Sequence, residues 1–219
     1  MLLIRFAFDF LSPYAYLAWQ ALPAIAERHG RTLQPMPVVF AALLGANGQK
    51  GPAEIPSKRI YVFKDATRTA HVLGVPLVPP PLHPFNPILA LRACGLPMLD
   101  TQRNALVSAL FDACWGGARR DLADPSVVAD VASSIGLDGT ARVTEASTEA
   151  AKARLRAQTD EALKLGAFGV PTMFVDGEMF WGYDSLGHLE RRLGGIDPVD
   201  QLDLSVWSGL PAGATRRVK

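Results

Sequence analysis

The order of hydrophobic and polar positions predicts a strand, a helix and a second strand in the first 40 residues. Ile, Phe and Leu dominate residues 2–9, which is typical of a buried strand. Ser12 and Pro13 then supply an N-cap and a first-turn proline for a helix that we expect to run to about Arg28. Residues 32–40 return to strand character, and their prolines suit an edge strand or an irregular one.

The middle of the chain is predicted to be helical apart from two irregular stretches. Residues 41–56 form a Gly- and Ala-rich stretch that we interpret as a long loop, and residues 75–87 hold too many prolines for regular structure. Between these stretches we expect a helix that is capped by Ser57 and ends at Gly74. Further helices are predicted at 87–93, at about 99–115, after an Asp124-Pro125 cap, and at about 144–165.

Strand character returns near the end of the chain. Residues 172–175 and 178–181 flank Asp176-Gly177, a pair typical of the two-residue turn of a β-hairpin. A last helix is expected from Asp184 to Leu193.

These elements predict one α/β domain whose two halves lie at the two ends of the chain. The first half is β-α-β, the second half is β-β-α, and an all-helical block separates them. The predicted division is a discontinuous domain of residues 1–45 and 166–195, a helical insertion of residues 46–165, and a C-terminal tail of residues 196–219.

Composition narrows the class of protein. The 219 residues are 49% hydrophobic and 20% charged, which is enough for a core and argues against disorder. The net charge of +1, without long runs of either sign, argues against nucleic-acid and membrane partners and favours small molecules. With neither a signal-peptide pattern nor a stretch of roughly 20 apolar residues, we expect a soluble, cytoplasmic protein.

Cysteine and histidine usage adds two expectations. Cys94 and Cys114 are the only cysteines, and we interpret them as buried apolar residues of a protein from a reduced compartment. The four histidines lack the spacing of a metal site, so no metal is predicted.

Four segments, in this order, carry a resemblance to a known family: "FDFLSPYAYLA", "GANGQKGPAEIPSKRIYVFKDATR", "HPFNPILALRA" and "GAFGVPTMFVDGEMFWGYDSL". With them the chain resembles the bacterial 2-hydroxychromene-2-carboxylate isomerases, which are relatives of the kappa-class glutathione transferases and distant relatives of the DsbA oxidoreductases. The resemblance implies a thioredoxin-like fold with an inserted all-helical subdomain, and glutathione as the cofactor.

Ser12 is the candidate catalytic residue. In thiol oxidoreductases of this superfamily the helix N-terminus carries Cys-x-x-Cys, because the helix dipole stabilises a thiolate. Here Ser12-Pro13-Tyr14-Ala15 takes that place, so a thiolate brought by a cofactor is the natural occupant. The resemblance implies that Ser12 donates its hydroxyl hydrogen to the glutathione sulfur. The alternative is that Ser12 is only an N-cap, worth about 1 kcal/mol.

The resemblance also implies how the rest of glutathione is bound. It predicts a cis Val170-Pro171 bond that turns the Val170 backbone toward the glutathione peptide, as an added strand would pair. Tyr183 and Asp184 lie at the γ-glutamyl end, where Asp184 meets the ammonium group. The alternatives are an ordinary trans proline at Pro171 and a plain N-cap at Asp184. Gln49 matches a family position near the cofactor.

Two further residues are assigned to the substrate by the resemblance. Lys58 is expected to stabilise the carboxylate or the oxyanion of the substrate. Asn86 matches an active-site amide of the family that holds the substrate. Lys58 shares a helical face with Tyr61, Asp65 and Arg68, which is also the pattern of a solvated face with local ion pairs.

The function implied is a glutathione-dependent cis-trans isomerase of 2-hydroxychromene-2-carboxylate or a related intermediate of aromatic-ring degradation. The thiolate adds to a conjugated carbon, the former double bond rotates, and expulsion of the thiol restores the alkene. The proline-rich loop and the inserted helices are expected to wall an apolar pocket for the substrate. A kappa-class-like glutathione transferase and a non-catalytic glutathione- or peptide-binding module are the alternatives. A homodimer is common in such families, and the sequence leaves the oligomeric state open.

Overall fold

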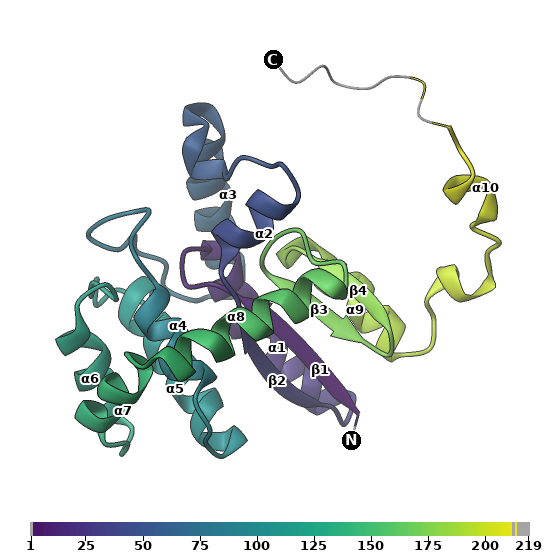
Figure 1. Ribbon diagram of the computed structural model, residues 1–219. Coiled ribbons are helices and arrows are strands. Elements are labelled where there is room, and N and C mark those ends of the chain that lie inside the picture. The colour runs from purple at the N-terminus through teal and green to yellow at the C-terminus, as the bar shows by residue number, and fades with distance from the viewer. Residues whose placement is uncertain (1, 212, 214–219) are drawn as a thin grey trace.

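A mixed four-stranded sheet lies at the centre of the computed structural model, which describes residues 2–211 and 213. The strands are β1 (Leu3–Phe8), β2 (Thr32–Pro37), β3 (Thr172–Val175) and β4 (Glu178–Trp181). Their order is β2-β1-β3-β4, with β2 parallel to β1 and with β3 antiparallel to both β1 and β4. Strands from the two ends of the chain therefore meet in one sheet (Figure 1).

Helices occupy most of the remaining chain. They are α1 (Pro13–Arg28), α2 (Phe40–Ala46), η1 (Pro52–Glu54), α3 (Pro56–Leu73), α4 (Ile88–Gly95), α5 (Asp100–Trp115), α6 (Pro125–Ser134), α7 (Gly139–Ala146), α8 (Glu149–Lys164), η2 (Tyr183–Ser185), α9 (Leu186–Leu193), η3 (Pro198–Gln201) and α10 (Ser205–Ser208). In Figure 1, α8 crosses the front of the sheet and α1 lies behind it.

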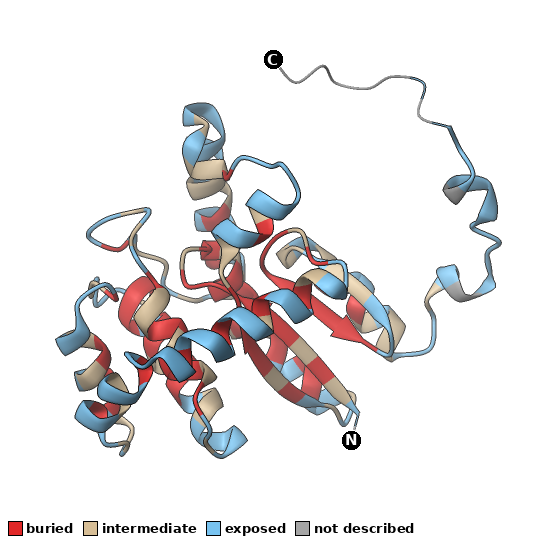
Figure 2. Ribbon diagram, in the orientation of Figure 1, coloured by how far each residue is buried: buried red, intermediate tan, exposed pale blue. Residues whose placement is uncertain are grey.

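The alternation of side chains along β1 determines which helices cover each face of the sheet. Phe6 and Phe8 point into the main core, where Phe8 packs against Phe111 of α5 at a ring-centroid distance of 5.5 Å. Ala7, between them, packs with Ala162 of α8 on the opposite face. The buried residues form a continuous band through the sheet and the helices beside it (Figure 2). The inserted helix α5 thus shares its core with the sheet, and the division of the chain into a sheet domain and an inserted subdomain stays a prediction.

Several of the expected elements are confirmed. The hairpin of β3 and β4 has the predicted bounds, and β2, with its prolines, is an edge strand. The helix α3 ends at Gly74, which has a left-handed φ of 68° that glycine adopts without strain.

Cys94 and Cys114 are free and buried, and burial raises the pKa of the Cys94 thiol to about 12.

Two predictions for residues 41–57 were wrong. The stretch interpreted as a long loop contains α2 and η1, because the segment Phe40–Ala46 is built mainly of Ala and Leu, which favour a helix. The following helix α3 begins two residues earlier than expected, at Pro56, and its N-cap is Ile55 rather than Ser57. Proline suits the first helical position, where its missing N–H removes no hydrogen bond.

Two other helix boundaries also differ from the prediction. The single helix expected at 144–165 is two helices, because Asp138 and Thr148 each accept a backbone N–H and cap α7 and α8 separately. The last helix was expected to start at Asp184. Instead the short helix η2 comes first, and α9 follows with Ser185 as N-cap and no side-chain cap.

The chain after Leu193 leaves the core. The helices η3 and α10 expose the apolar side chains of Val199, Val206 and Trp207. Figure 2 shows most of this part of the chain in the colour of exposed residues. Residues 212 and 214–219 of the predicted tail lie outside the described residues. Of the helices described, none combines the length and the hydropathy needed to cross a bilayer.

A buried carboxylate joins the end of β1 to α2. Asp9 is 1% exposed, and its two oxygens accept hydrogen bonds from the N–H groups of Leu11 and Phe40, at 3.0 and 2.9 Å. Burial raises the pKa of Asp9 to about 6, against the opposing effect of the two N–H groups. Asp9 therefore links the turn that enters α1 with the first residue of α2.

We predict that Asp9→Asn destabilises the protein, and more so at low pH. Asparagine has one acceptor oxygen, so the N–H of either Leu11 or Phe40 loses its partner, at a cost of about 1–3 kcal/mol. The folded-state pKa of Asp9 lies above that of an unfolded aspartate, so folding favours the protonated carboxyl group. The contribution of Asp9 to the free energy of unfolding is therefore fully present below about pH 4 and is lost as the pH rises through about 6. The destabilisation measured by urea unfolding should therefore be larger near pH 4.5 than near pH 7.5, by about 2 kcal/mol.

The control is Glu178→Gln, which changes an exposed carboxylate of β4. Its effect should be small and nearly independent of pH. Equal destabilisation by Asp9→Asn at the two pH values would contradict the prediction.

Candidate active site

The N-terminus of α1 and the loop before β3 meet at Ser12 and Val170. The Ser12 hydroxyl oxygen accepts a hydrogen bond from the Ala15 N–H at 3.1 Å, so Ser12 caps α1 as predicted. The same hydroxyl donates to the Val170 carbonyl oxygen at 3.5 Å, a long contact. The Val170–Pro171 peptide bond is cis, as the resemblance implied. The Ser12 hydrogen is therefore only weakly engaged.

Two backbone N–H groups next to Ser12 have no partner among the described residues. They belong to Tyr14, in the first turn of α1, and to Val170. The first N–H groups of a helix have no partner within the helix, and the helix dipole adds positive potential at this end. The site thus offers a hydroxyl hydrogen and two backbone donors to an anion.

A cavity of about 260 Å³ adjoins these donors. Its apolar lining includes Leu11 and Pro13 beside Ser12, Phe40, Ala41 and Leu44 of α2, Val62 and Phe63 of α3, and Pro84 of the proline-rich loop. Ser12, Tyr14, Glu54, Arg59 and His83 are its polar side chains. The proline-rich loop and the inserted helices form the walls, as predicted.

His83 attaches the proline-rich loop to the entrance of α1. Its Nε2 lies 2.9 Å from the Leu11 carbonyl oxygen, and because a carbonyl only accepts, Nε2 carries the hydrogen. The other ring nitrogen, Nδ1, is buried without a partner among the described residues. Burial lowers the pKa of His83 and the charge of Arg59 lowers it as well, against the opposing effect of the hydrogen bond to the Leu11 carbonyl oxygen, and the lowered pKa favours the neutral ring.

Arg59 holds the same loop from the other side. Its Nη2 donates a hydrogen bond to the His83 carbonyl oxygen at 2.9 Å. The sequence analysis singled out neither Arg59 nor His83. Arg59 follows Lys58 directly in the helix, and nothing in the local sequence distinguishes the two basic residues.

Asp184 lies near Tyr14, close to the N-terminus of α1. The Tyr14 hydroxyl donates to an Asp65 carboxylate oxygen at 2.7 Å. The pKa of Tyr14 is raised by burial first, then by Asp65, and also by the negative charge of Asp184. Gly182 has a φ of 89°, which other residues adopt only with strain, and a Cβ there would also contact Asp184 Oδ1, so this turn favours glycine. Asp184 is exposed and free to meet a cation.

The predicted site residues divide into two groups. In the first group, Ser12, Val170 and Pro171 lie together. The Gly182 N–H donates a hydrogen bond to the Pro171 carbonyl oxygen at 2.9 Å. This bond holds Tyr183 and Asp184, the next two residues of the chain, beside the first three. The other three predicted residues, Gln49, Lys58 and Asn86, are exposed and do not line the cavity. Asn86 accepts a hydrogen bond from the Ile88 N–H at the start of α4.

The sheet and the helix N-terminus beside a cis-proline loop define a DsbA-like, thioredoxin-fold protein. A family model described as a DSBA-like thioredoxin domain matches residues 3–194. A 2-hydroxychromene-2-carboxylate isomerase of Pseudomonas putida is 36% identical over 197 residues, covering 88% of this chain and 95% of the relative. The chain belongs to the DSBA-like thioredoxin family and, within it, to the family of the 2-hydroxychromene-2-carboxylate isomerases.

Two further relatives agree with this placement. The structure of a selenomethionine 2-hydroxychromene-2-carboxylate isomerase matches with a TM-score of 0.82 and 32% identity, over 91% of this chain and 98% of that one. A glutathione S-transferase kappa 1 of Caenorhabditis elegans is 26% identical over 80% of this chain and 81% of its own length. The predicted thioredoxin-like fold is confirmed.

Proposed function

We propose that this protein is a glutathione-dependent cis-trans isomerase of 2-hydroxychromene-2-carboxylate or a closely related aromatic acid. The observation that carries the proposal is the site at Ser12, where Ser12-Pro13-Tyr14-Ala15 takes the place of the Cys-x-x-Cys of a redox site and two backbone N–H groups have no partner among the described residues. The isomerase relatives support the reaction, and the kappa-class relative supports the cofactor.

The residues of the site fit glutathione. The unpaired Tyr14 N–H and the weakly engaged Ser12 hydroxyl suit a thiolate, since both donate to an anion at the positive end of α1. The unpaired Val170 N–H and its carbonyl suit the cofactor's peptide group, in the manner of an added strand. The exposed Asp184 suits the γ-glutamyl ammonium.

Each residue then has one role in the proposed reaction. Glutathione, when bound, supplies a thiolate that adds reversibly to a conjugated carbon and so lets the former double bond rotate. Ser12 lowers the pKa of the thiol by donating its hydroxyl hydrogen to sulfur. The apolar cavity excludes water from the reacting carbon, and that exclusion strengthens the electrostatic effect of Ser12 and of the Tyr14 N–H.

The assignments of Tyr183 and Gln49 to glutathione, and of Asn86 to the substrate, remain predictions. The resemblance also assigned Lys58 to the substrate, but Lys58 is exposed and does not line the cavity, so we do not include it in the proposed site. A kappa-like transferase is the second candidate function, favoured by the kappa-class relative. A transferase would use the same donors and would release a conjugate.

We predict that glutathione stabilises the protein and that Asp184→Asn weakens its binding. A ligand at 100 times its Kd adds about 2.7 kcal/mol to the free energy of unfolding, which raises Tm. Asp184 caps no helix through its side chain, so the variant should unfold like the wild type without ligand while binding glutathione more weakly. Calorimetric titration measures the affinity. An unchanged Tm with millimolar glutathione and a flat titration of the wild type would rule out the cofactor.

We predict that the Ser12 variants raise the pKa of the bound thiol by about one to two units, because a hydrogen bond to a charged group is worth about 1.5–3 kcal/mol. The measurement is ultraviolet titration of the thiolate with saturating glutathione. Ser12→Ala also loses the N-cap, at about 1 kcal/mol, whereas Ser12→Gly loses only a few tenths.

The two Ser12 variants therefore separate activation of the thiol from stability. Both should show the same alkaline shift, and only Ser12→Ala should unfold at clearly lower urea concentration. If wild type and variants titrate at the same pH, Ser12 is only a cap.

We predict that turnover consumes no glutathione. The cis and trans forms of the substrate should interconvert at a catalytic concentration of glutathione, and free thiol assayed before and after many turnovers should be constant. Loss of one thiol per product would identify a transferase instead.

A further inference from the structure

A second, wider hollow adjoins the cavity at Ser12. It has a volume of about 650 Å³ and lies between α3 and the proline-rich loop. Leu77, Pro79 and Trp115 are among the residues that line it. Ala53, Arg59 and Phe63 line both hollows, so the two meet at these residues. We call the second hollow the outer groove.

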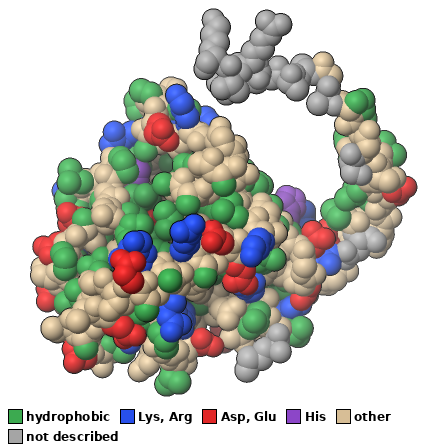
Figure 3. Space-filling view, viewed as in Figure 1, with side chains coloured by type: hydrophobic (Ala, Val, Ile, Leu, Met, Phe, Trp, Pro, Cys, Tyr) green, Lys and Arg blue, Asp and Glu red, His purple; other side chains and the backbone are tan. Residues whose placement is uncertain are grey.

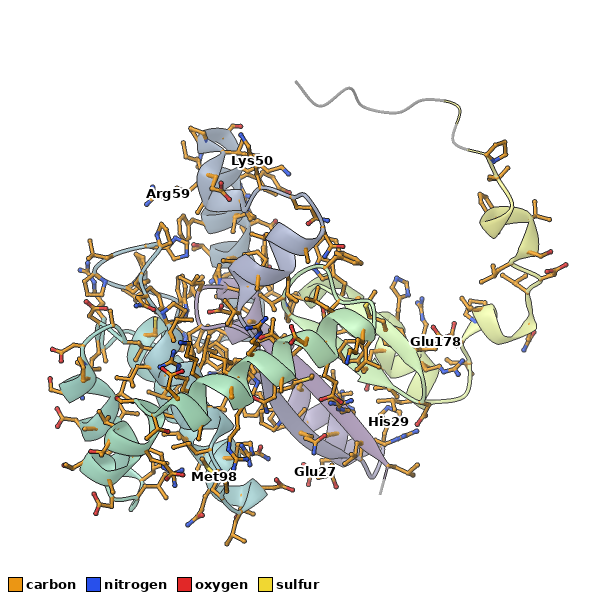
Figure 4. The ribbon with its side chains drawn as sticks, in the orientation of Figure 1. Glu27, His29, Lys50, Arg59, Met98 and Glu178 are labelled. Carbon is orange, nitrogen blue, oxygen red and sulfur yellow. The ribbon has the colours of Figure 1, made fainter. Side chains whose placement is uncertain are left out.

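Among the described residues, Arg59 is the one positively charged residue that lines both hollows, and it has no acidic partner among them. The hydrogen bond from its Nη2 to the His83 carbonyl oxygen restrains the guanidinium. Figure 4 shows Arg59 projecting from α3 on the side where the proline-rich loop lies. Within the described part of the chain no carboxylate lies within 4.0 Å of it, whereas Arg5 pairs with Glu161 at 2.7 Å.

The residues around Arg59 indicate the chemical class of ligand that it could bind. A guanidinium has five N–H donors in a planar fork. The hydrogen bond to the His83 carbonyl oxygen uses one of them, so the others remain to bind the two oxygens of a carboxylate. The half-buried ring of Phe63 provides a flat apolar wall in the outer groove, and Ile60, Leu77 and Pro79 extend the apolar surface beside it. Trp115 is fully buried and packs against Phe63 at a ring-centroid distance of 6.4 Å, which supports this wall. A positive charge between apolar walls suits an acid with a flat apolar body.

The neighbouring basic residue does not share this position. Both residues are exposed, but Lys58 lines neither hollow, whereas Arg59 lines both. Elsewhere on the face shown in Figure 3, basic and acidic side chains are interspersed. Among the described residues that line the two joined hollows, the positive charge therefore comes from Arg59. Glu54, the acidic residue of the lining, accepts a hydrogen bond from the Gly51 N–H at 2.6 Å.

We propose that Arg59 binds the substrate carboxylate and that the aromatic body of the substrate lies in the outer groove. This inference deepens the proposed function and rests on it, because the cavity at Ser12 must hold the reacting carbon beside the cofactor thiolate. It assigns to Arg59 the role that the sequence comparison suggested for Lys58, and it adds the outer groove to the substrate site.

The test compares a flat aromatic acid with its uncharged amide. 2-Naphthoate and 2-naphthamide are titrated by calorimetry into the full-length protein without glutathione. The wild type should prefer the acid by about tenfold or more, the effect of a hydrogen bond to a charged group. Arg59→Gln should lose this preference and bind the two probes about equally. The matched control, Lys58→Gln, should keep it.

A second variant tests the outer groove. Thr67 lines the groove from an exposed position on α3, so Thr67→Trp should fill the groove with little effect on folding. It should weaken binding of the acid and the amide alike. Unchanged binding of both probes would overturn the placement of the aromatic body.

Three results overturn the role of Arg59: no preference for the acid in the wild type, a preference that survives in Arg59→Gln, or its loss in Lys58→Gln. The glutathione-induced rise in Tm is measured on every variant and should be kept, which shows that each variant is folded. If glutathione does not raise the Tm of the wild type but the wild type prefers the acid through Arg59, the assignment of glutathione as the cofactor is wrong and the assignment of Arg59 to the carboxylate is kept.

Discussion

The antiparallel pairing of β1 with β3 is the interaction on which the site depends. In the observed register Ala7 lies opposite Thr172. Continuing both chains past this pair brings the residues after β1 alongside the residues before β3, so Ser12 and Val170 meet although 158 positions separate them. A slip of one residue would turn every side chain of the strand to the other face and exchange Phe6 and Phe8 for Ala7 in the main core. The main core and the site therefore require the same register.

A chain of hydrogen bonds then builds the cavity onto this junction. Asp9 holds the turn before α1 against α2, His83 joins the proline-rich loop to Leu11, and Arg59 joins α3 to that loop. These contacts place apolar walls directly beside unpaired backbone donors. A thioredoxin-like helix N-terminus without cysteine thus keeps its preference for an anion and gains a pocket for an apolar molecule.

Local signals explain which parts of the fold could be predicted. The Asp176-Gly177 turn, the Ser12-Pro13 helix start and the Gly74 helix end depend on residue types whose backbone preferences act within a few positions. The helix α2 was missed because its alanines and leucines lie next to a Gly-rich stretch. The boundary between α7 and α8 was missed because an apolar periodicity can continue across a single capping residue, here Thr148.

The sequence by itself determined the family, the helix N-terminus at Ser12 and the cis-proline loop, because these depend on short motifs read in order along the chain. Only the tertiary structure decided which basic residue faces the cavity. Lys58 and Arg59 are adjacent, and successive residues of a helix point about 100° apart, so the rotation of α3 against the proline-rich loop selects between them. That rotation is set by the packing of α3 on distant segments, and no local pattern around residue 58 records it.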